Sequence, residues 1–278
     1  MKGVDIVSAK VSIIMAAYNS ASTIAESIES ILQQTFTDWE FIICDDGSTD
    51  NTFQIIQEYA AKYPGKIIAI QNERNSKLPY SLNHCLKYVT GEYVARMDAD
   101  DRSYPDRLDK QYNYLVSHPE IDVVGAGMTC FDGARITGER LPPKEPSSQI
   151  IGLGVPFFHA TIMMKKTVYD ALDGYSLRDY VLRCEDVDLW IRFFAKGFKG
   201  ANLQESLYYV REDMAASRRR NFKNATNASK TLLYGFHENG YPLKQYLYVA
   251  KPIISVLVPQ KLKYAINQRR WRTNKKEM

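Results

Sequence analysis

Apolar segments alternate with amphipathic ones through the first hundred residues, and this alternation limits the fold more than any other feature of the chain. The segments with the apolar, β-branched character of buried strands are 11–16, 39–44, 66–70 and 92–97. Helical patterns separate them, over residues 24–32, 53–59 and 78–88. Strands and helices that alternate at this spacing form βαβ units, so we predict an α/β fold with a Rossmann-like, mainly parallel mixed sheet flanked by helices.

Polar and acidic side chains follow three of these strands at the point where each strand ends. They are Tyr18-Asn19, Asp45-Asp46 and the cluster Asp98, Asp100 and Asp101. Ligands of open α/β sheets bind at the carboxyl ends of the strands, so we expect these side chains to share one crevice. Carboxylates without nearby His or Cys favour Mg²⁺ or Mn²⁺, completed by phosphate oxygens and water. The alternative is a solvated acidic turn before the helix that begins near Pro105.

The second half of the chain continues the pattern less regularly. We predict a helix over 105–117, a hairpin and a Pro-rich loop over 129–146, a helix that begins at Glu185, and strands over 121–125 and 159–164. The composition changes near Arg211, after which the chain is helical in pattern and basic. This predicts a leader over 1–10, a principal domain over 11–210 and a helical, basic C-terminal extension over 211–278.

Charge and cysteine usage exclude several classes of function. A formal net charge of +4 on 278 residues does not indicate a nucleic-acid-binding protein. The four cysteines are far apart and form no Cys-x-x-Cys pair, which argues against a zinc site and a redox motif and favours reduced thiols in the cytosol. We see neither a signal peptide nor a stretch apolar enough to span a bilayer, and so predict a cytoplasmic protein.

Residues 243–276 allow two interpretations. The apolar segment 243–258, interrupted by Lys244, Lys251 and Pro252, precedes a strongly basic tail. Such a segment can lie in the interface of an anionic membrane, which would make the protein peripheral on the inner face of the cell membrane. It can equally pack on the principal domain as an ordinary helix, with a solvated tail.

Five segments, taken together and in order, resemble the family 2 glycosyltransferases. These segments are 11–19 (VSIIMAAYN), 31–40 (ILQQTFTDWE), 45–50 (DDGSTD), 95–101 (ARMDADD) and 185–190 (EDVDLW). The resemblance covers about Val11 to Asp213. It implies the GT-A fold, an inverting mechanism and a nucleotide-sugar donor, which we expect to be a UDP-sugar.

The resemblance also implies residues that bind the donor. Ala16 and Tyr18 would line the nucleobase pocket, and Asp46, with Asp45, would accept a hydrogen bond from the base. The nucleotide would further contact Asn75, Lys77 and Asp98, and Asp98 would meet either the ribose or the metal. Asp100 would hold a Mn²⁺ or Mg²⁺ ion that bridges the diphosphate, while Asp101 would brace the loop.

On the acceptor side, the resemblance makes Asp186 the general base. Direct displacement at the anomeric carbon needs a carboxylate to deprotonate the acceptor hydroxyl, and Glu185 is the alternative base or an acceptor contact. His159 is either a contact to diphosphate or acceptor, or a satisfied, partly buried histidine. Residues 211–220 contain Glu212-Asp213 and Arg218–Arg220. Whether these acids supply a third metal ligand, and whether these arginines contact phosphate, is left open by the sequence.

These observations predict an inverting, metal-dependent glycosyltransferase. It would move a sugar from a UDP-sugar to a hydroxyl of a lipid-linked or polysaccharide acceptor. Two alternatives remain: a nucleotidyltransferase that makes a sugar nucleotide, and a non-catalytic module that binds sugar nucleotides or polysaccharide. The segment Tyr18-Asn19-Ser20 argues against the first, because a triphosphate usually needs a Gly-rich, basic loop after the first strand.

Overall fold

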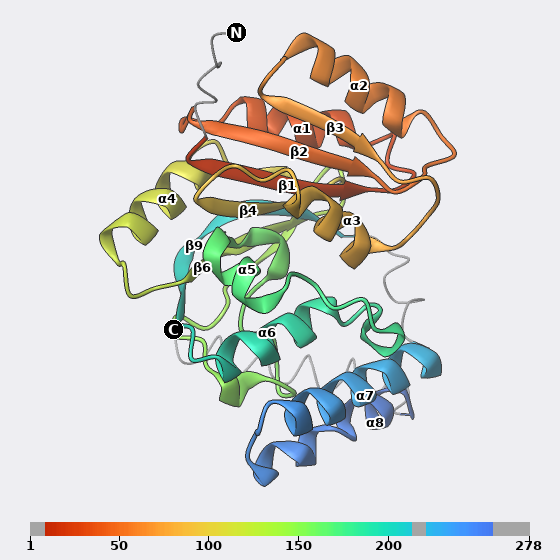
Figure 1. The fold of residues 1–278 in the computed structure, drawn as a ribbon, viewed down its shortest axis with the longest axis vertical. Coiled ribbons are helices and arrows are strands. Elements are labelled where there is room, and N and C mark those ends of the chain that lie inside the picture. Colours follow the sequence, from red (N-terminus) through yellow and green to blue (C-terminus); the bar gives the residue numbers. More distant parts are fainter. Residues whose placement is uncertain (1–8, 213–220, 258–278) are drawn as a thin grey trace, which may run out of the picture.

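A mixed sheet forms the centre of the computed structural model, which describes residues 9–212 and 221–257 (Figure 1). Its strands are β1 (Val11–Ala17), β2 (Trp39–Asp45), β3 (Ile67–Gln71), β4 (Tyr93–Asp98), β5 (Arg102–Ser103), β6 (Val123–Phe131), β7 (Ile136–Arg140), β8 (Met163–Lys165) and β9 (Gly200–Arg211). The strand order is β3-β2-β1-β4-β8-β6-β9-β5, and β7 pairs with β6.

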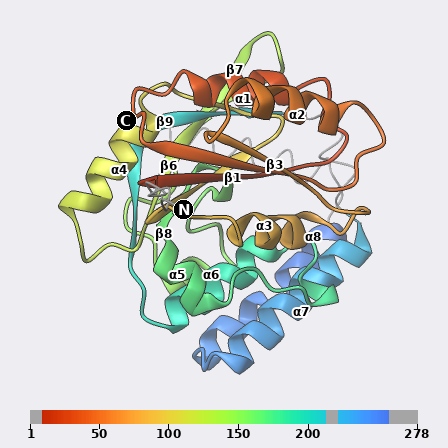
Figure 2. The same cartoon turned by 45° about the horizontal axis from the view of Figure 1, so that its top comes forward.

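Helices cover both faces of this sheet (Figure 2). The α-helices are α1 (Ile24–Leu32), α2 (Thr52–Lys62), α3 (Leu78–Leu86), α4 (Arg107–Ser117), α5 (Lys166–Leu172), α6 (Glu185–Ala195), α7 (Phe222–Glu238) and α8 (Lys251–Leu257). Short 3₁₀ helices are η1 (Ser148–Ile150), η2 (His159–Thr161), η3 (Asp179–Val181) and η5 (Leu243–Tyr248).

The half of the sheet built from β3, β2, β1 and β4 is parallel, as the sequence predicts. β1, β2 and β4 are buried on both faces, which explains their nearly continuous apolar sequences. The register aligns the carboxyl ends of the three strands that are followed by polar and acidic side chains. Ala17 lies opposite Asp45, and Ala16 lies opposite Asp98. The mixed α/β architecture therefore matches the predicted fold class.

The other half of the sheet departs from the sequence interpretation. A strand over 159–164 is wrong: His159–Thr161 forms η2, and β8, which is antiparallel to β4 and β6, begins at Met163. The Thr161 side chain explains the break, because its hydroxyl bonds to the backbone of Ala126 and Phe158 instead of leaving the segment free to extend. The sequence interpretation also missed α5 and the long strand β9.

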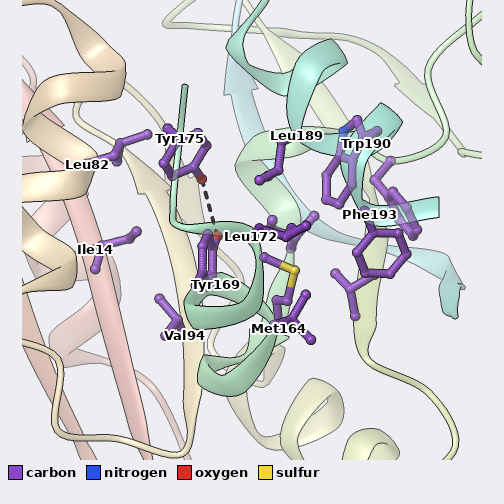
Figure 3. Packing of buried hydrophobic residues seen from close by; sticks show 14 of the residues in the cluster. Ile14, Leu82, Val94, Met164, Tyr169, Leu172, Tyr175, Leu189, Trp190 and Phe193 are labelled. Atoms are coloured by element: carbon purple, nitrogen blue, oxygen red, sulfur yellow. Dashed lines mark hydrogen bonds between the residues drawn. The ribbon is translucent and has the colours of Figure 1, made fainter. Parts of the chain in front are cut away.

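Two apolar cores lie on opposite faces of the sheet. On one face, α1, α2 and α4 pack against alternate residues of β1, such as Ile13 and Met15. On the other face, α3, α5 and α6 pack around Ile14 and its neighbours, where the Tyr169 and Tyr175 hydroxyls lie 3.2 Å apart (Figure 3). The period-two alternation of strand side chains produces this division.

The C-terminal helices join the second core. Leu232 and Phe236 of α7 are buried in it, and the Tyr241 hydroxyl donates to the Ile191 carbonyl oxygen of α6 at 2.9 Å. The predicted single helix over 243–258 is wrong, because η5 and α8 divide the segment. The leader up to residue 8, residues 213–220 and the tail from residue 258 lie outside the described residues. In the described ranges, no helix is both long and apolar enough to cross a membrane.

Gly91 sits where β1 and β4 approach most closely at their amino ends. Its N–H donates to the Ser12 hydroxyl, and a Cβ at this position would lie 2.7 Å from the Ser12 backbone nitrogen. We expect Gly91→Ala to lower the free energy of unfolding by about 1–3 kcal/mol, because backbone must move to admit the methyl group. Urea unfolding followed by circular dichroism measures this.

Gly138 provides the matched control. It lies in β7, and a Cβ there would meet nothing within 4 Å. Gly138→Ala should therefore leave stability unchanged or raise it by up to about 1 kcal/mol through the unfolded state. Equal effects of the two substitutions would contradict the close approach at Gly91.

Candidate active site

A cavity of about 620 Å³ opens at the carboxyl ends of β1 and β4. It brings together four of the residues predicted from the sequence, namely Ala16, Tyr18, Asp98 and Asp100. The remaining lining residues are Asn19, Ser20, Ser22, Thr23, Ala99, Asp132, Arg211 and Glu212. Tyr18 and Asp100 are exposed, so both present their side chains to a ligand in this cavity, which we call the strand-end cavity.

Arg96 places a positive charge below this cavity. The sequence interpretation did not single out this residue. It is buried in β4, and its guanidinium holds the Asp98 carboxylate with two contacts, at 2.7 and 3.0 Å. Burial alone would lower the pKa of Arg96, but Asp98 more than offsets this and raises it. An arginine inside an otherwise apolar strand was the sequence signal for this ion pair, because such a charge needs a partner.

Asp101 is buried and braces the loop after β4, in agreement with the sequence prediction. Its carboxylate accepts a hydrogen bond from the Arg211 backbone N–H at 2.7 Å, and its carbonyl oxygen accepts one from the Ser27 hydroxyl. Burial, together with the negative charges of Asp98 and Asp100, raises the pKa of Asp101 to about 8. Removal of the carboxyl group from water is the larger of these two causes.

Asp45 and Asp46 lie at the end of β2 and are both buried, and neither lines the strand-end cavity. Asp46 accepts three hydrogen bonds of 2.8 Å, from the Asn72 side chain and from the backbone N–H groups of Ser76 and Lys77. The oxygens of Asp45 differ: Oδ2 accepts from the Ser48 backbone N–H and the Gln71 side chain, whereas Oδ1 is buried and has no partner in the described part of the chain. An unpaired buried acceptor is costly, so Oδ1 of Asp45 is an acceptor in need of a donor.

Asn75 and Lys77 belong to the loop that Asp46 holds. The Lys77 ammonium group donates to the Asn75 side chain at 2.8 Å, and Lys77 is exposed. The Lys77 backbone has φ 77° and ψ 161°, a region that essentially only glycine adopts without strain. Backbone strain of this kind is a feature of ligand-binding loops, and the two hydrogen bonds of this loop to Asp46 hold it in place.

Glu185 and Asp186 form the first turn of α6, where carboxylates suit the helix dipole. Asp186 lines a second, mainly apolar cavity of about 290 Å³, not the strand-end cavity. Burial raises the pKa of both carboxyl groups, and the positive charge of Arg96 opposes the rise in each. Glu185 Oε2 is buried without a partner. Arg96 therefore acts electrostatically on Asp98 and on both predicted acceptor-side acids.

His159 lies in η2 and is half-buried. Its Nε2 lies 3.0 Å from the Tyr175 hydroxyl, whereas Nδ1 is buried and has no hydrogen-bond partner among the described residues, so only one of the two ring nitrogens is satisfied. Burial, with a smaller contribution from the Arg96 charge, lowers the pKa of His159 well below its usual value. The ring is therefore neutral at physiological pH.

The carboxylates of the strand-end cavity fit a Mg²⁺ or Mn²⁺ ion that is shared with phosphate. In the described residues, no group of three or more His, Cys, Asp or Glu side chains could hold a metal by itself. Such ions often use only one or two protein carboxylates, with phosphate and water as the other ligands. Asp100 is exposed at the cavity, whereas Asp98 would have to share its carboxylate with Arg96.

Glu212, one candidate for a third ligand, is paired elsewhere. Its carboxylate bonds to Arg140 at 2.5 Å and to the Thr137 hydroxyl at 2.7 Å. Asp213 and Arg218–Arg220 lie outside the described residues. Arg211 lines the cavity, and its side chain contacts the Asp100 carbonyl oxygen and the Glu26 carboxylate.

Comparison with known proteins gives a family match. The model of "Glycosyl transferase family 2" matches residues 12–177. EpsE of Bacillus subtilis (strain 168), whose name gives its glycosyltransferase activity as provisional, is 48% identical over 250 residues, 90% of each chain. WfaP of Escherichia coli, named as a UDP-Glc:alpha-D-GlcNAc-diphosphoundecaprenol beta-1,3-glucosyltransferase, is 29% identical over 80% of this chain and 85% of its own.

Solved structures share the fold at low sequence identity. Residues 1–349 of Staphylococcus aureus TarS in complex with UDP-GlcNAc match with a TM-score of 0.65 and 21% identity, over 88% of this chain and 71% of that one. The mannosyltransferase PcManGT of Pyrobaculum calidifontis, in complex with GDP-Man and Mn²⁺, matches with a TM-score of 0.64 and 16% identity, over 94% and 80%.

Asp101 should make the metal-free protein sensitive to pH. Its carboxyl group is protonated in the folded state up to about pH 8 but ionises near its ordinary value in the unfolded chain. The folded state then binds more protons between these values, so the free energy of unfolding falls as pH rises through this window. Asp101→Asn should flatten this fall by up to about 1.4 kcal/mol per pH unit.

Urea unfolding in EDTA at several pH values between 5 and 9 measures the slope. Asp173→Asn is the control, because Asp173 is exposed and its substitution leaves the buried cluster intact. A wild-type slope in Asp101→Asn would show that Asp101 is already ionised in the folded protein.

Proposed function

Because this chain belongs to glycosyl transferase family 2 and is therefore a glycosyltransferase, we propose that it transfers a sugar, with inversion, from a UDP-sugar to a hydroxyl of a lipid-linked or saccharide acceptor in polysaccharide biosynthesis. One observation carries the donor half of this proposal. The parallel register of β1, β2 and β4 gathers Ala16, Tyr18, Asp98 and Asp100 around one cavity at the carboxyl ends of the strands.

We assign the nucleobase to the Tyr18 side of this cavity, next to the end of β2. Asp45 supports this assignment, since its Oδ1 lacks the hydrogen-bond donor that a uracil N–H supplies. Asp46 supports it through the loop, since it holds Asn75 and Lys77 beside the site by binding Ser76 and Lys77 backbone N–H groups. Both carboxylates are buried, so nucleotide binding would require the loop over 72–77 to move.

We place the diphosphate at Asp98 and Asp100, with Mn²⁺ or Mg²⁺ between it and Asp100. The cation, when bound, would neutralise negative charge that develops on the leaving nucleoside diphosphate. The exposed side chain of Asp100 at the cavity supports a cation here, because Mg²⁺ and Mn²⁺ often use only one or two protein carboxylates, with phosphate and water as the other ligands. Complexes of structural neighbours with UDP-GlcNAc, and with GDP-Man and Mn²⁺, are consistent with this arrangement.

We assign the general base to Asp186. Burial raises its pKa, which makes the carboxylate a stronger base than an exposed aspartate. Its Oδ1 accepts the Val187 backbone N–H at 2.8 Å, which fixes the carboxylate at the start of α6. In this mechanism Asp186 takes the proton of the acceptor hydroxyl as the sugar–diphosphate bond breaks on the opposite face of the anomeric carbon. Glu185 would then contact the acceptor.

Family membership sets aside the two alternatives from the sequence, nucleotidyl transfer and a non-catalytic binding module.

We further propose that the reaction takes place at the inner surface of the cell membrane, which would make the protein cytoplasmic and peripheral. Leu243, Leu247, Ile254 and Leu257 support this, because all are more than half exposed on η5 and α8. Sedimentation with anionic but not neutral vesicles is the expected result, and no sedimentation with either would refute it.

Asp45 and Asp46 should differ in how they affect UDP binding. Asp45→Asn replaces one carboxylate oxygen with an NH₂ group, a donor, where the N–H of the base needs an acceptor. UDP should therefore bind about tenfold more weakly or worse, with little change in stability. Asp46→Asn keeps only one acceptor oxygen, so it should lose at least one of the three hydrogen bonds that Asp46 accepts and lower the free energy of unfolding by about 1–3 kcal/mol. Calorimetric titration with UDP and Mn²⁺, beside thermal unfolding, separates the two. Wild-type UDP affinity in Asp45→Asn would remove Asp45 from the nucleobase site.

Asp186→Asn should reduce sugar transfer by about 10²–10⁴-fold and leave UDP affinity near normal. In the wild type, kcat/KM should rise with pH as Asp186 ionises. Because the pKa of Asp186 is raised, this rise should occur at a higher pH than it would for an exposed aspartate. Asp188→Asn is the matched control on the same helix, since Asp188 pairs with Arg192 and should affect stability more than transfer. Transfer at the wild-type rate by Asp186→Asn would exclude it as the base.

A further inference from the structure

The second cavity, of about 290 Å³, lies between the segment 151–156 and the helices α6, α7 and α8. Most of its wall is apolar or glycine, and among its lining residues only Asp186 and Lys251 are charged. The rest of the lining consists of Ile151, Gly152, Leu153, Gly154, Val155, Pro156, Val187, Trp190, Ala228, Leu232 and Pro252. A cavity of this composition favours an apolar ligand group, with polar recognition at one or two points.

The cavity wall contains the predicted base and an unused hydrogen-bond donor. Asp186 lines the cavity, so a ligand that fills it lies against that carboxylate. Trp190, which is buried and packs beside Phe193 (Figure 3), also lines it, and the indole N–H of Trp190 has no hydrogen-bond partner within residues 9–212 and 221–257. A buried donor without a partner costs free energy that a ligand acceptor could recover.

Among the described residues that line the cavity, Lys251 is the one cation and most of the others are apolar. Leu153 and Val155 in the wall are 54% and 43% exposed, and Ile254 on the next turn of α8 is 56% exposed. Lys251 donates to the carbonyl oxygens of Gly152 and Leu153, which fixes its ammonium group at the junction of α8 and the segment 151–156. An apolar recess with a fixed ammonium group complements a molecule that joins an apolar chain to a phosphate.

We propose that this cavity binds the first apolar units of the acceptor's lipid chain, with the acceptor phosphate beside Lys251 and its sugar toward Asp186. This inference rests on the proposed function. A saccharide acceptor without a lipid has no group for such a recess, and the volume, at the low end for small-ligand pockets, suits a short part of a chain. The diphosphoundecaprenol acceptor in the name of WfaP joins a phosphate to an isoprenoid chain in this way.

Farnesyl phosphate is a soluble probe with both features, and calorimetric titration measures its binding. Ala228→Phe, which would fill the cavity from α7, should weaken farnesyl phosphate binding by about tenfold or more, and Leu153→Asn should weaken it in the same direction. Both variants should keep wild-type UDP affinity. Lys251→Met should make farnesyl phosphate bind no better than farnesol, because the cation that distinguishes them is gone.

Leu141→Asn is the matched control. Leu141 is 54% exposed, like Leu153, but it follows β7 and does not line the cavity. This control should leave farnesyl phosphate binding unchanged. An equal loss in Leu141→Asn would show non-specific adsorption and overturn the inference.

Several results separate this site from the proposed function. No binding of farnesyl phosphate to the wild type up to about 1 mM, with intact UDP binding and transfer, overturns the cavity assignment alone. A lower unfolding temperature in Leu153→Asn without any effect on the probe would mean that the chain's own residues cover the cavity, which also overturns it. Probe binding that Ala228→Phe abolishes, in a protein that transfers no sugar, would support the cavity and refute the function.

Discussion

The ion pair between Arg96 and Asp98 is the interaction on which the site depends. β4 is buried on both faces, and a guanidinium group there is tolerated only because the Asp98 carboxylate accepts two of its contacts. The same strand end carries Asp100 and Asp101, so Arg96 also offsets part of the acidic charge. Arg107 lies close by and is buried as well, with its pKa lowered to about 10, mainly by burial. Opposite charges therefore lie close together beneath the strand-end cavity.

The parallel half of the sheet could be predicted from the sequence because each strand is an uninterrupted apolar run. β1 and β2 are such runs, and helical periodicity is clear on either side of them. The other half, in which β6 and β9 pair in parallel and the remaining pairs are antiparallel, gave no such signal. β9 contains Asn202, Gln204 and Glu205, and it is extended because β6 and β5 pair with it on its two edges. Long-range pairing, which is invisible in a local pattern, decided that element.

The site could be predicted only as far as strand ends determine it. The convergence of Tyr18, Asp98 and Asp100 follows from parallel topology, and the sequence was sufficient for it. The sequence could not predict the different hydrogen bonding of Asp45 and Asp46, because both residues have the same chemistry and adjacent positions. The donors that Asp46 binds come from a loop 30 residues away, whose course depends on the strained backbone of Lys77.

The separation of the two cavities changes how the site should be understood. The sequence predicted one crevice for the polar side chains that follow β1, β2 and β4, whereas Asp46 lines neither cavity and Asp186 lines a different cavity from Asp100. An inverting displacement does not require a common groove, because the base and the leaving diphosphate act on opposite faces of the anomeric carbon. It requires that both approach one sugar. The charge of Arg96 acts on Asp98, on Glu185 and on Asp186, so the distance between the donor and acceptor sides is short enough for one guanidinium group to influence both.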